Sequence, residues 1–134
     1  HSVNLKAVFF CCQAGAKLMR KNGGGRIVNL SSLGGIRPWS EHVHYCASKA
    51  GVIMLTRALA KALAPEIAVN SVAPGVIPFE EGLDERRAKL VAATPMRRAG
   101  TGEEIAEAVA NFLRSSPFVT GQVLAVDGGL SQRA

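Results

Sequence analysis

A tyrosine and a lysine four positions apart, Tyr45 and Lys49, are the residues of this sequence best suited to chemistry. If the segment is helical, this spacing puts a phenol and an ammonium group on one helix face, with Cβ atoms about 5–6 Å apart. A cation beside a phenol favours the phenolate, and so lowers a pKa that is ordinarily about 10. A tyrosine tuned in this way can give or take a proton near neutral pH, as a general acid or base must.

Helices and strands alternate along the chain, which predicts an α/β fold with a parallel, doubly wound (Rossmann-type) sheet covered by helices on both faces. Helices are expected at residues 2–21, 43–63 and 84–93, with another opened by the capping box of Thr101 and Glu104. Strands are expected at 26–31, 68–73 and 122–126. A loop is expected from Ser32 to about His42.

Apolar periodicity and chain breakers support these helices. In the first helix, apolar residues recur at Val3, Ala7, Phe10, Ala14 and Leu18. The last helix is expected to carry its apolar residues on one side: Ile105, Val109, Phe112 and Leu113. Asn22-Gly23-Gly24-Gly25 ends the first helix, and the helix of residues 43–63 ends before Pro65.

The fold predicts where Tyr45 and Lys49 lie. Ligands of open parallel sheets bind at the carboxyl ends of the strands. Ser32 follows the first expected strand and Pro74-Gly75 follows the second, so both should lie on one rim. The helix that carries Tyr45 and Lys49 starts from the same region, and the sequence therefore predicts a shared crevice.

Composition excludes several classes of function. The 134 residues, 48% of them hydrophobic, are enough for one domain with a substantial core. No apolar run approaches the ~20 residues of a membrane span, and no export signal is visible. The net charge of +6 is spread over small groups without interleaved aromatics, which argues against nucleic-acid binding.

Three cysteines, Cys11, Cys12 and Cys46, contain no CxxC pair and are odd in number. This argues against a disulfide framework and against a zinc site, and we expect no metal. A reducing cytoplasm fits best. Cys11 and Cys12 lie in an apolar helical pattern and are interpreted as core residues.

The spacing of these motifs resembles the carboxyl-terminal half of a short-chain dehydrogenase/reductase. Tyr45 lies 13 positions after Ser32, and Asn4 lies 28 positions before that serine, which resembles the family's Asn-Ser-Tyr-Lys tetrad. The flanking sequence also resembles that of the family, over the segments Val3-Asn4-Leu5, 25–32, 69–75, 119–121 and 126–129. The resemblance covers nearly the whole chain.

The resemblance implies a role for each site residue. Tyr45 would donate a proton to a carbonyl oxygen while hydride arrives from a nicotinamide cofactor, NADP or alternatively NAD. Lys49 would hold the nicotinamide ribose, and Ser32 would bond the substrate oxygen. Asn4 would support a water that leads protons to Lys49. The nicotinamide would be flanked by Pro74, Gly75 and the backbone near Ile77.

The chain departs from the family pattern at two points. Phe79 stands where the family usually has a threonine that bonds the nicotinamide amide. The glycine-rich turn that would hold the cofactor pyrophosphate is missing from these residues, because the Gly23–Gly25 run precedes a strand instead of following one. Residues 1–134 are therefore expected to be the carboxyl-terminal catalytic half of one domain, without the amino-terminal half that binds the dinucleotide phosphates.

Some interpretations stay open at the sequence level. Trp39 either covers the substrate or packs the loop, and His42 and His44 either tune Tyr45 or lie on the lip of the pocket. Segments 63–70 and 76–82 look like pteridine reductases, whereas the commoner type for such chains is a 3-oxoacyl carrier-protein reductase.

Two functions from different classes are therefore considered. The first is an oxidoreductase that reduces a carbonyl, or oxidises an alcohol, with Tyr45 as general acid/base. The second is a non-catalytic fragment or interaction module that keeps the fold and binds no dinucleotide. The family resemblance implies a homodimer or homotetramer through helices 2–21 and 43–63, and the first strand would leave an open apolar edge without the missing half.

Overall fold

The computed structural model describes residues 5–78 and 84–132 of the chain. Seven helices and strands follow one another in these residues: α1 (Ala7–Lys21), β1 (Gly25–Leu30), α2 (Val43–Leu63), β2 (Ile67–Pro74), α3 (Glu85–Ala93), α4 (Gly102–Arg114) and β3 (Val123–Val126). Short 3-10 turns are present as well: η2 (Leu33–Gly35), η3 (Ser40–His42) and η4 (Leu130–Gln132). The order of helices and strands predicted from the sequence is confirmed.

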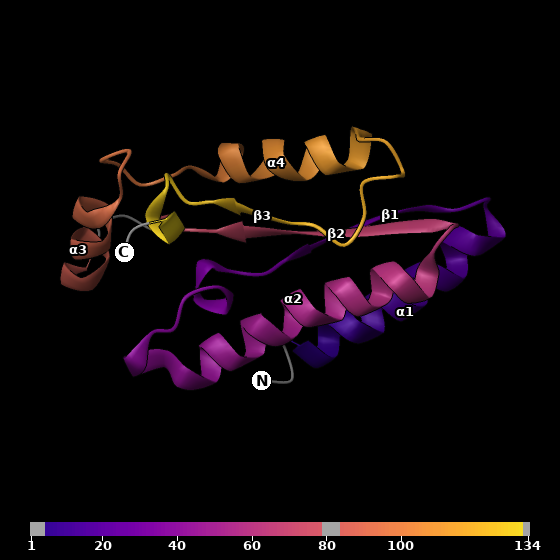
Figure 1. The fold of residues 1–134 in the computed structure, drawn as a ribbon, viewed down its shortest axis with the longest axis horizontal. Helices are drawn as coiled ribbons and strands as arrows, with labels where there is room; N and C mark the ends of the chain where they lie inside the picture. Colours follow the sequence, from indigo (N-terminus) through magenta and orange to yellow (C-terminus); the bar gives the residue numbers. More distant parts are fainter. Residues whose placement is uncertain (1–4, 79–83, 133–134) are drawn as a thin grey trace.

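The three strands form one parallel sheet in the order β1-β2-β3. The register places Gly25 opposite Ile67 and Ser71 opposite Val123. Figure 1 shows α1 and α2 on one face of the sheet and α4 on the other, as expected for parallel strands joined by helical crossovers. The carboxyl ends of the strands, the start of α2 and the whole of α3 lie at one end of the molecule.

The central strand β2 supplies the core on both faces, because successive strand residues point to opposite sides. Ile67 and Val69 face α1 and α2, whereas Val72 faces α4. The first cluster contains Ala16, Ala60, Leu63, Ile67 and Val69; the second contains Val72, Ile77, Ile105 and Ala108. Each side chain of β2 from Ile67 to Ala73 is buried, which fixes the sheet between the two helical layers.

The apolar repeat of α1 lies on the exposed side of the helix. Phe10 is 51% and Leu18 is 64% exposed, while Cys12 and Ala16 are buried against the rest of the protein. Of the two cysteines expected in the core, Cys12 is buried and Cys11 is exposed. The helix itself was predicted correctly, but it begins at Ala7, and of the earlier predicted positions residues 2–4 lie outside the described residues.

Element ends differ from the expectations by one or a few residues. Ser31 lies just outside β1, β2 extends one residue further at each end, and β3 begins at Val123. The capping box of α4 is confirmed, with Thr101 and Glu104 each bonding the backbone of the other. Leu113, expected on the apolar side of α4, is instead 47% exposed.

The outer strand β1 has no neighbour on its far side among residues 5–78 and 84–132. Leu30 at its carboxyl end is 50% exposed. An open strand edge of this kind offers unpaired backbone groups to another chain or segment. None of the helices in the described residues is long and apolar enough to cross a membrane.

Candidate active site

The segment after β1 packs on the backbone of α2 and thereby positions Lys49. A Cβ atom on Gly35 would lie 2.7 Å from the carbonyl carbon and 2.8 Å from the carbonyl oxygen of Lys49. On Gly34, a Cβ atom would lie 3.2 Å from Cε1 of Tyr45. Glycine at these two positions therefore lets η2 approach the helix closely enough to bring the end of β1 beside both residues.

The two serines at the end of β1 have different surroundings. Ser31 Oγ donates to the carbonyl of Val72 at 3.2 Å and accepts from Ser71 Oγ at 2.8 Å, so it ties β1 to β2. Ser32 Oγ accepts from the backbone N–H of Gly34 at 3.1 Å and caps η2. Because that bond uses only its acceptor capacity, the hydroxyl hydrogen of Ser32 stays available to a carbonyl oxygen.

Tyr45 and Lys49 lie one turn apart on α2, as the spacing predicted. The Nζ atom of Lys49 is 5.8 Å from the centroid of the Tyr45 ring and donates to the carbonyl of Leu30 at 3.4 Å. Burial lowers the pKa of Lys49 from 10.5, because the charged form loses water. The hydroxyl of Tyr45 makes no hydrogen bond to any residue in the described part of the chain.

Trp39 lies directly beside Tyr45. The two rings are parallel within 6°, with centroids 6.1 Å apart. The thiol of Cys46 accepts a hydrogen bond from the backbone N–H of Trp39 at 3.4 Å, which holds the loop against α2. These contacts agree with the interpretation that Trp39 packs the loop, and a role in covering the substrate stays a prediction.

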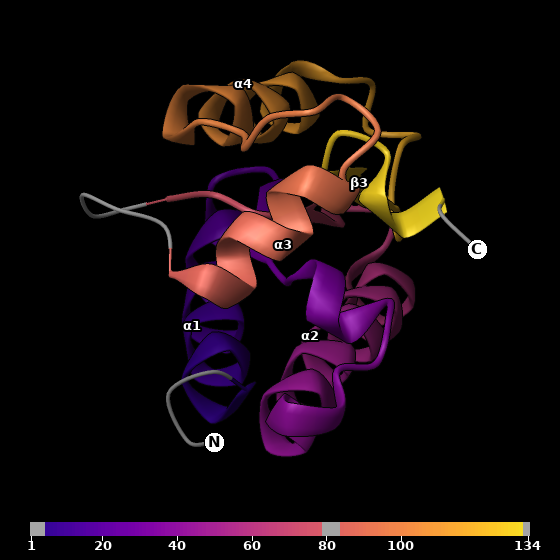
Figure 2. The ribbon, with the colours of Figure 1, turned by 90° about the vertical axis from the view of Figure 1, so that its left-hand side faces the viewer.

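The helix α3 contributes a residue that sequence reasoning missed. The Cζ atom of Arg86 lies 5.1 Å from the centroid of the Trp39 ring, and Nη1 lies 2.6 Å from Nε2 of His42. Figure 2 shows α3 above the loop that carries these two partners and above the start of α2, at the same end of the molecule. Nothing in the local sequence of α3 could have signalled this contact, since it joins segments more than 40 positions apart.

At the end of β2, Pro74 and Gly75 are in close contact with the end of β3. The backbone N–H of Gly75 donates to the carbonyl of Val126 at 3.0 Å. A Cβ atom on Gly75 would lie 2.7 Å from both Cα and Cβ of Asp127, so a larger residue would separate the two strand ends. The side chain of Ile77 is buried in the cluster beneath α4, which leaves its backbone as the part relevant to the predicted role.

Two cavities lie near this end of the molecule. One of about 180 Å³ is lined by Val76, Thr94, Met96, Arg98, Gly100, Glu104, Val126, Asp127 and Gly128. The other, of about 310 Å³, is lined by Ala92, Ala93, Thr94, Pro95, Arg97, Gly129 and Gln132. Neither cavity is lined by Ser32, Tyr45 or Lys49.

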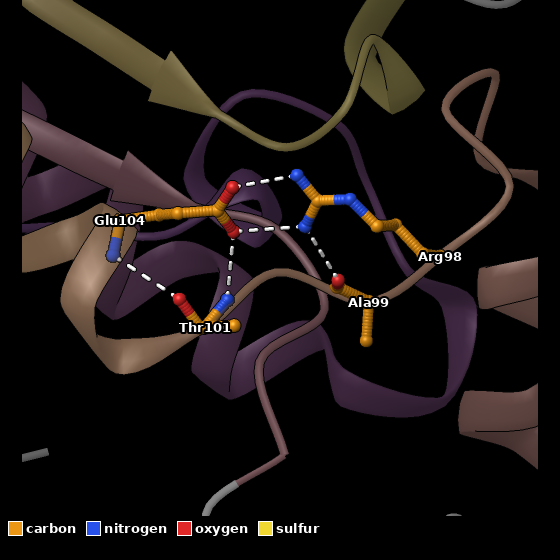
Figure 3. A network of polar contacts seen from close by, with 4 residues as sticks. All are labelled: Arg98, Ala99, Thr101 and Glu104. Atoms are coloured by element: carbon orange, nitrogen blue, oxygen red, sulfur yellow. Dashed lines mark hydrogen bonds and ion pairs between the residues drawn. The ribbon is translucent and has the colours of Figure 1, made fainter.

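A network of polar contacts joins Arg98, Thr101 and Glu104 (Figure 3). Arg98 and Glu104 also line the smaller cavity. Glu104 accepts from Arg98 at 2.6 and 2.9 Å and from the backbone N–H of Thr101 at 2.9 Å. The hydroxyl of Thr101 accepts from the N–H of Glu104 at 3.2 Å. The Arg98 hydrogen bonds are the main cause that lowers the pKa of Glu104 to about 2. This network fixes the start of α4.

Two predicted positions cannot be placed. Asn4 and Phe79 lie outside the described residues. Among the residues that are described, no group of three side chains of the metal-ligating types comes together. The structure thus brings Ser32, Tyr45 and Lys49 to one rim through η2 and α2, with Pro74 and Gly75 at the neighbouring strand end.

Comparison with known proteins identifies relatives over almost the whole chain. Residues 1–131 match the family described as Enoyl-(Acyl carrier protein) reductase. The chain is 46% identical to a 3-oxoacyl-[acyl-carrier-protein] reductase of Thermotoga maritima, over 96% of this chain and 54% of the relative. It is 41% identical to the human protein of the same description, over 95% of this chain and 54% of that one.

Solved structures of similar proteins share the fold of this chain. A gluconate 5-dehydrogenase from Burkholderia cenocepacia, in complex with NADP and tartrate, superposes with a TM-score of 0.91 at 34% identity, covering 98% of this chain and 55% of its own. ElxO with NADP bound gives a TM-score of 0.88 at 30% identity, covering 97% and 56%. The chain spans about half the length of the curated relatives that it matches. Of the two subgroups suggested by the sequence, the curated relatives from Thermotoga maritima and human carry the 3-oxoacyl reductase description.

Proposed function

Because the chain belongs to the short-chain dehydrogenase/reductase family, we propose that the protein containing it is an oxidoreductase that reduces a carbonyl, or oxidises an alcohol, with a nicotinamide cofactor. Residues 1–134 would be the carboxyl-terminal catalytic half of a single domain. The observation that carries the proposal is the pair on α2: a tyrosine hydroxyl without a hydrogen-bond partner in the described residues and, one turn away, a half-buried lysine that bonds the carbonyl of Leu30.

Tyr45 is the proposed general acid and base. When bound, the cofactor supplies or accepts the hydride. In reduction the carbonyl π bond breaks, its carbon gains the hydride, and its oxygen takes the proton from Oη of Tyr45. In oxidation the same Tyr45 oxygen takes the proton back. A hydroxyl that is bonded elsewhere would be a poorer donor, so the free Oη of Tyr45 suits this role.

Lys49 is proposed to favour the Tyr45 phenolate and to hold the ribose of the cofactor. Its ammonium has three donors, and the carbonyl of Leu30 takes one at 3.4 Å, which leaves donors for ribose hydroxyls. The free donors of Lys49 therefore match the hydroxyl groups of a nicotinamide ribose. Pro74, Gly75 and the backbone near Ile77 would flank the nicotinamide, and Asn4 would support the water that returns protons to Lys49.

Ser32 is proposed to bind the substrate oxygen. Its acceptor capacity is engaged by Gly34 and its hydroxyl hydrogen is free, so it can donate to a carbonyl oxygen in the ground state and to the developing alkoxide. The side chain is 6% exposed, which limits its freedom to rotate toward water. Ser32 and Tyr45 together would hold one oxygen from two directions.

The descriptions of the curated relatives favour a 3-oxoacyl thioester as substrate. The two similar structures that contain NADP favour this cofactor, with NAD as the alternative. The test is to incubate the full-length protein with NADPH or NADH and a panel of ketones, 3-oxoacyl thioesters and dihydropteridines, and to follow cofactor absorbance. Oxidation that depends on both substrate and Tyr45 is expected. No oxidation with any member of the panel would contradict the proposal and favour a non-catalytic module.

We also propose that the protein is a cytoplasmic homodimer or homotetramer that associates through α1 and α2. The two helices lie side by side beneath the sheet (Figures 1 and 2), and their outer faces expose Phe10, Leu18 and Met54, each more than half accessible. Exposed apolar side chains on adjacent helices are typical of an interface. Light scattering after size-exclusion of the full-length protein is expected to show the oligomer, and a stable monomer would contradict it.

A further inference from the structure

Arg86 is a cation beside the candidate active site that has no anionic partner in the described residues. The other charged residues of α3 are paired within the helix and its cap. Asp84 accepts from the backbone N–H of Arg87 and lies 3.9 Å from its guanidinium, and Lys89 lies 3.1 Å from Glu85. Arg86 instead contacts residues of another part of the chain.

The position of the Arg86 guanidinium is fixed by two groups of the site wall. It lies over the ring of Trp39, at 5.1 Å from the centroid, which is a favourable cation–π distance. It also contacts Nε2 of His42 at 2.6 Å. An arginine can only donate, so Nε2 of His42 is the acceptor in this contact. Glu41 next to His42 forms no ion pair with Arg86 within the described residues.

Trp39 links this cation to the chemistry. Its ring is parallel to that of Tyr45, with 6.1 Å between the centroids. The order Tyr45, Trp39, Arg86 therefore places a guanidinium at the far end of an aromatic wall that begins at the proposed proton donor. A substrate whose carbonyl sits at Tyr45 and whose chain follows the wall would reach Arg86.

The electrostatics of Arg86 favour an anion there. The side chain is partly buried, and a charge withdrawn from water without a counter-ion carries a desolvation cost. The guanidinium has five N–H donors in a planar fork, and one contact to His42 leaves the others for a carboxylate or a phosphate, which match this fork. A bound anion would offset the desolvation cost.

We propose that Arg86 recognises an anionic group, carboxylate or phosphate, carried by the carbonyl substrate itself. Arg86 is then a determinant of substrate specificity supplied by α3, and Trp39 is the surface along which the substrate lies. The inference rests on the proposed function, because it places the reacting carbonyl at Tyr45.

The test compares matched pairs of carbonyl compounds in the full-length protein with NADPH: levulinate against levulinamide, and dihydroxyacetone phosphate against dihydroxyacetone. The wild type is expected to favour the charged member of at least one pair by about 10- to 100-fold in kcat/KM, as for a hydrogen bond to a charged group. The phosphate and carboxylate pairs separate the two sources of charge.

Arg86→Gln is expected to abolish this ratio mainly through KM, since the bond is equal in the ground and transition states. Arg86→Lys should keep part of it. Arg87→Gln is the matched control, because it removes the same charge from the next position of the same helix and should leave the ratio unchanged. Calorimetric titration of levulinate and levulinamide should give the same ranking for binding.

Equal turnover and equal binding of the charged and neutral members would overturn this inference while leaving the proposed function intact. A ratio that survives Arg86→Gln, or that falls equally in Arg87→Gln, would overturn it as well. Turnover of none of the four compounds, with anion binding that still depends on Arg86, would count against the reaction and for the anion site.

Discussion

The Thr101–Glu104 pair and the Tyr45–Lys49 pair each span about one helical turn, yet only the first is satisfied by its neighbours. Glu104 and Thr101 exchange hydrogen bonds with each other, and Arg98 completes the network (Figure 3). Tyr45 and Lys49 make no hydrogen bond to each other, and the hydroxyl of Tyr45 has no partner in the described residues. The first pair holds a helix start, whereas the second retains capacity for a ligand.

The contrast gives a physical criterion for separating structural from functional polar residues. A polar group that serves the fold finds its partners within the fold, because an unmade hydrogen bond is costly. A group that serves a ligand keeps donors or acceptors open and is positioned by other elements. Here that positioning comes from η2, whose two glycines pack on α2 beside Tyr45 and Lys49.

A large effect, second only to the loss of the Tyr45 hydroxyl, is expected when the cation of the open pair is removed. Lys49→Met should lower kcat/KM of the full-length protein by about 100-fold, because the site loses both the cation beside Tyr45 and the proposed donor to the cofactor ribose. Steady-state kinetics measure this. Lys61→Met, at the other end of the same helix, is the control and should be near wild type.

The pH dependence of wild-type activity also tests the role of the Lys49 ammonium. Burial lowers the pKa of Lys49, so its ammonium is lost at a lower pH than the 10.5 of an exposed lysine. The desolvation penalty applies while Lys49 is charged in the folded state and is relieved as pH rises through its folded pKa, so stability gains while activity falls. A pH–rate profile whose alkaline limb lies at or above 10.5 would contradict this.

Next in size is the effect of filling the gap between η2 and α2. Gly35→Ala would put a Cβ atom 2.7 Å from the Lys49 carbonyl carbon, so backbone must move. We expect a loss of roughly 1–3 kcal/mol of folding free energy, as for overpacking, together with reduced activity. Denaturant unfolding and kinetics measure the two losses. Gly15→Ala on α1 is the control, because nothing lies within 4 Å of its added Cβ atom.

A smaller effect is expected in the closed pair. The pKa of Glu104 is lowered to about 2, so its contribution to stability is complete above its ordinary 4.5 and disappears as pH falls through about 2. In Glu104→Gln, the melting temperature should fall less steeply with decreasing pH than in the wild type. Turnover at neutral pH should not change. Glu103→Gln, one position earlier, should leave that fall as in the wild type.

The smallest expected effect is a gain in stability. Arg97 has a φ of 59°, in the left-handed region that favours glycine. Arg97→Gly should raise the free energy of unfolding by roughly 1 kcal/mol or less, the strain relieved minus the entropy that glycine adds to the unfolded chain. Thermal unfolding tests it. Arg97→Ala keeps the strain and should show no gain.

Local sequence signals predicted most of the fold. The bounds of α2 match the expected 43–63, since Pro65 sets its end. The ends of the strands were predicted to within one residue, because branched runs bounded by glycine or proline have few other conformations. The side of α1 that packs inward was not foreseeable, because its exposed Phe10 side and its buried Cys12 side are both apolar.

The candidate site was predictable only in part. The i,i+4 pair and the strand-end serine follow from spacing within short segments. The Arg86 contact with Trp39 and His42, and the approach of Gly35 to Lys49, depend on how distant segments meet in space. No periodicity or capping motif encodes such meetings, so they required the structure.

The comparison of Tyr45→Phe with Thr101→Ala in the full-length protein, by turnover and melting temperature, tests the central claim most directly. Tyr45→Phe should reduce kcat by 10²–10⁴-fold at an unchanged melting temperature, as for loss of a general acid or base. Thr101→Ala should retain turnover and lose about 1 kcal/mol of stability, as for loss of an N-cap. Wild-type turnover in Tyr45→Phe would contradict the account.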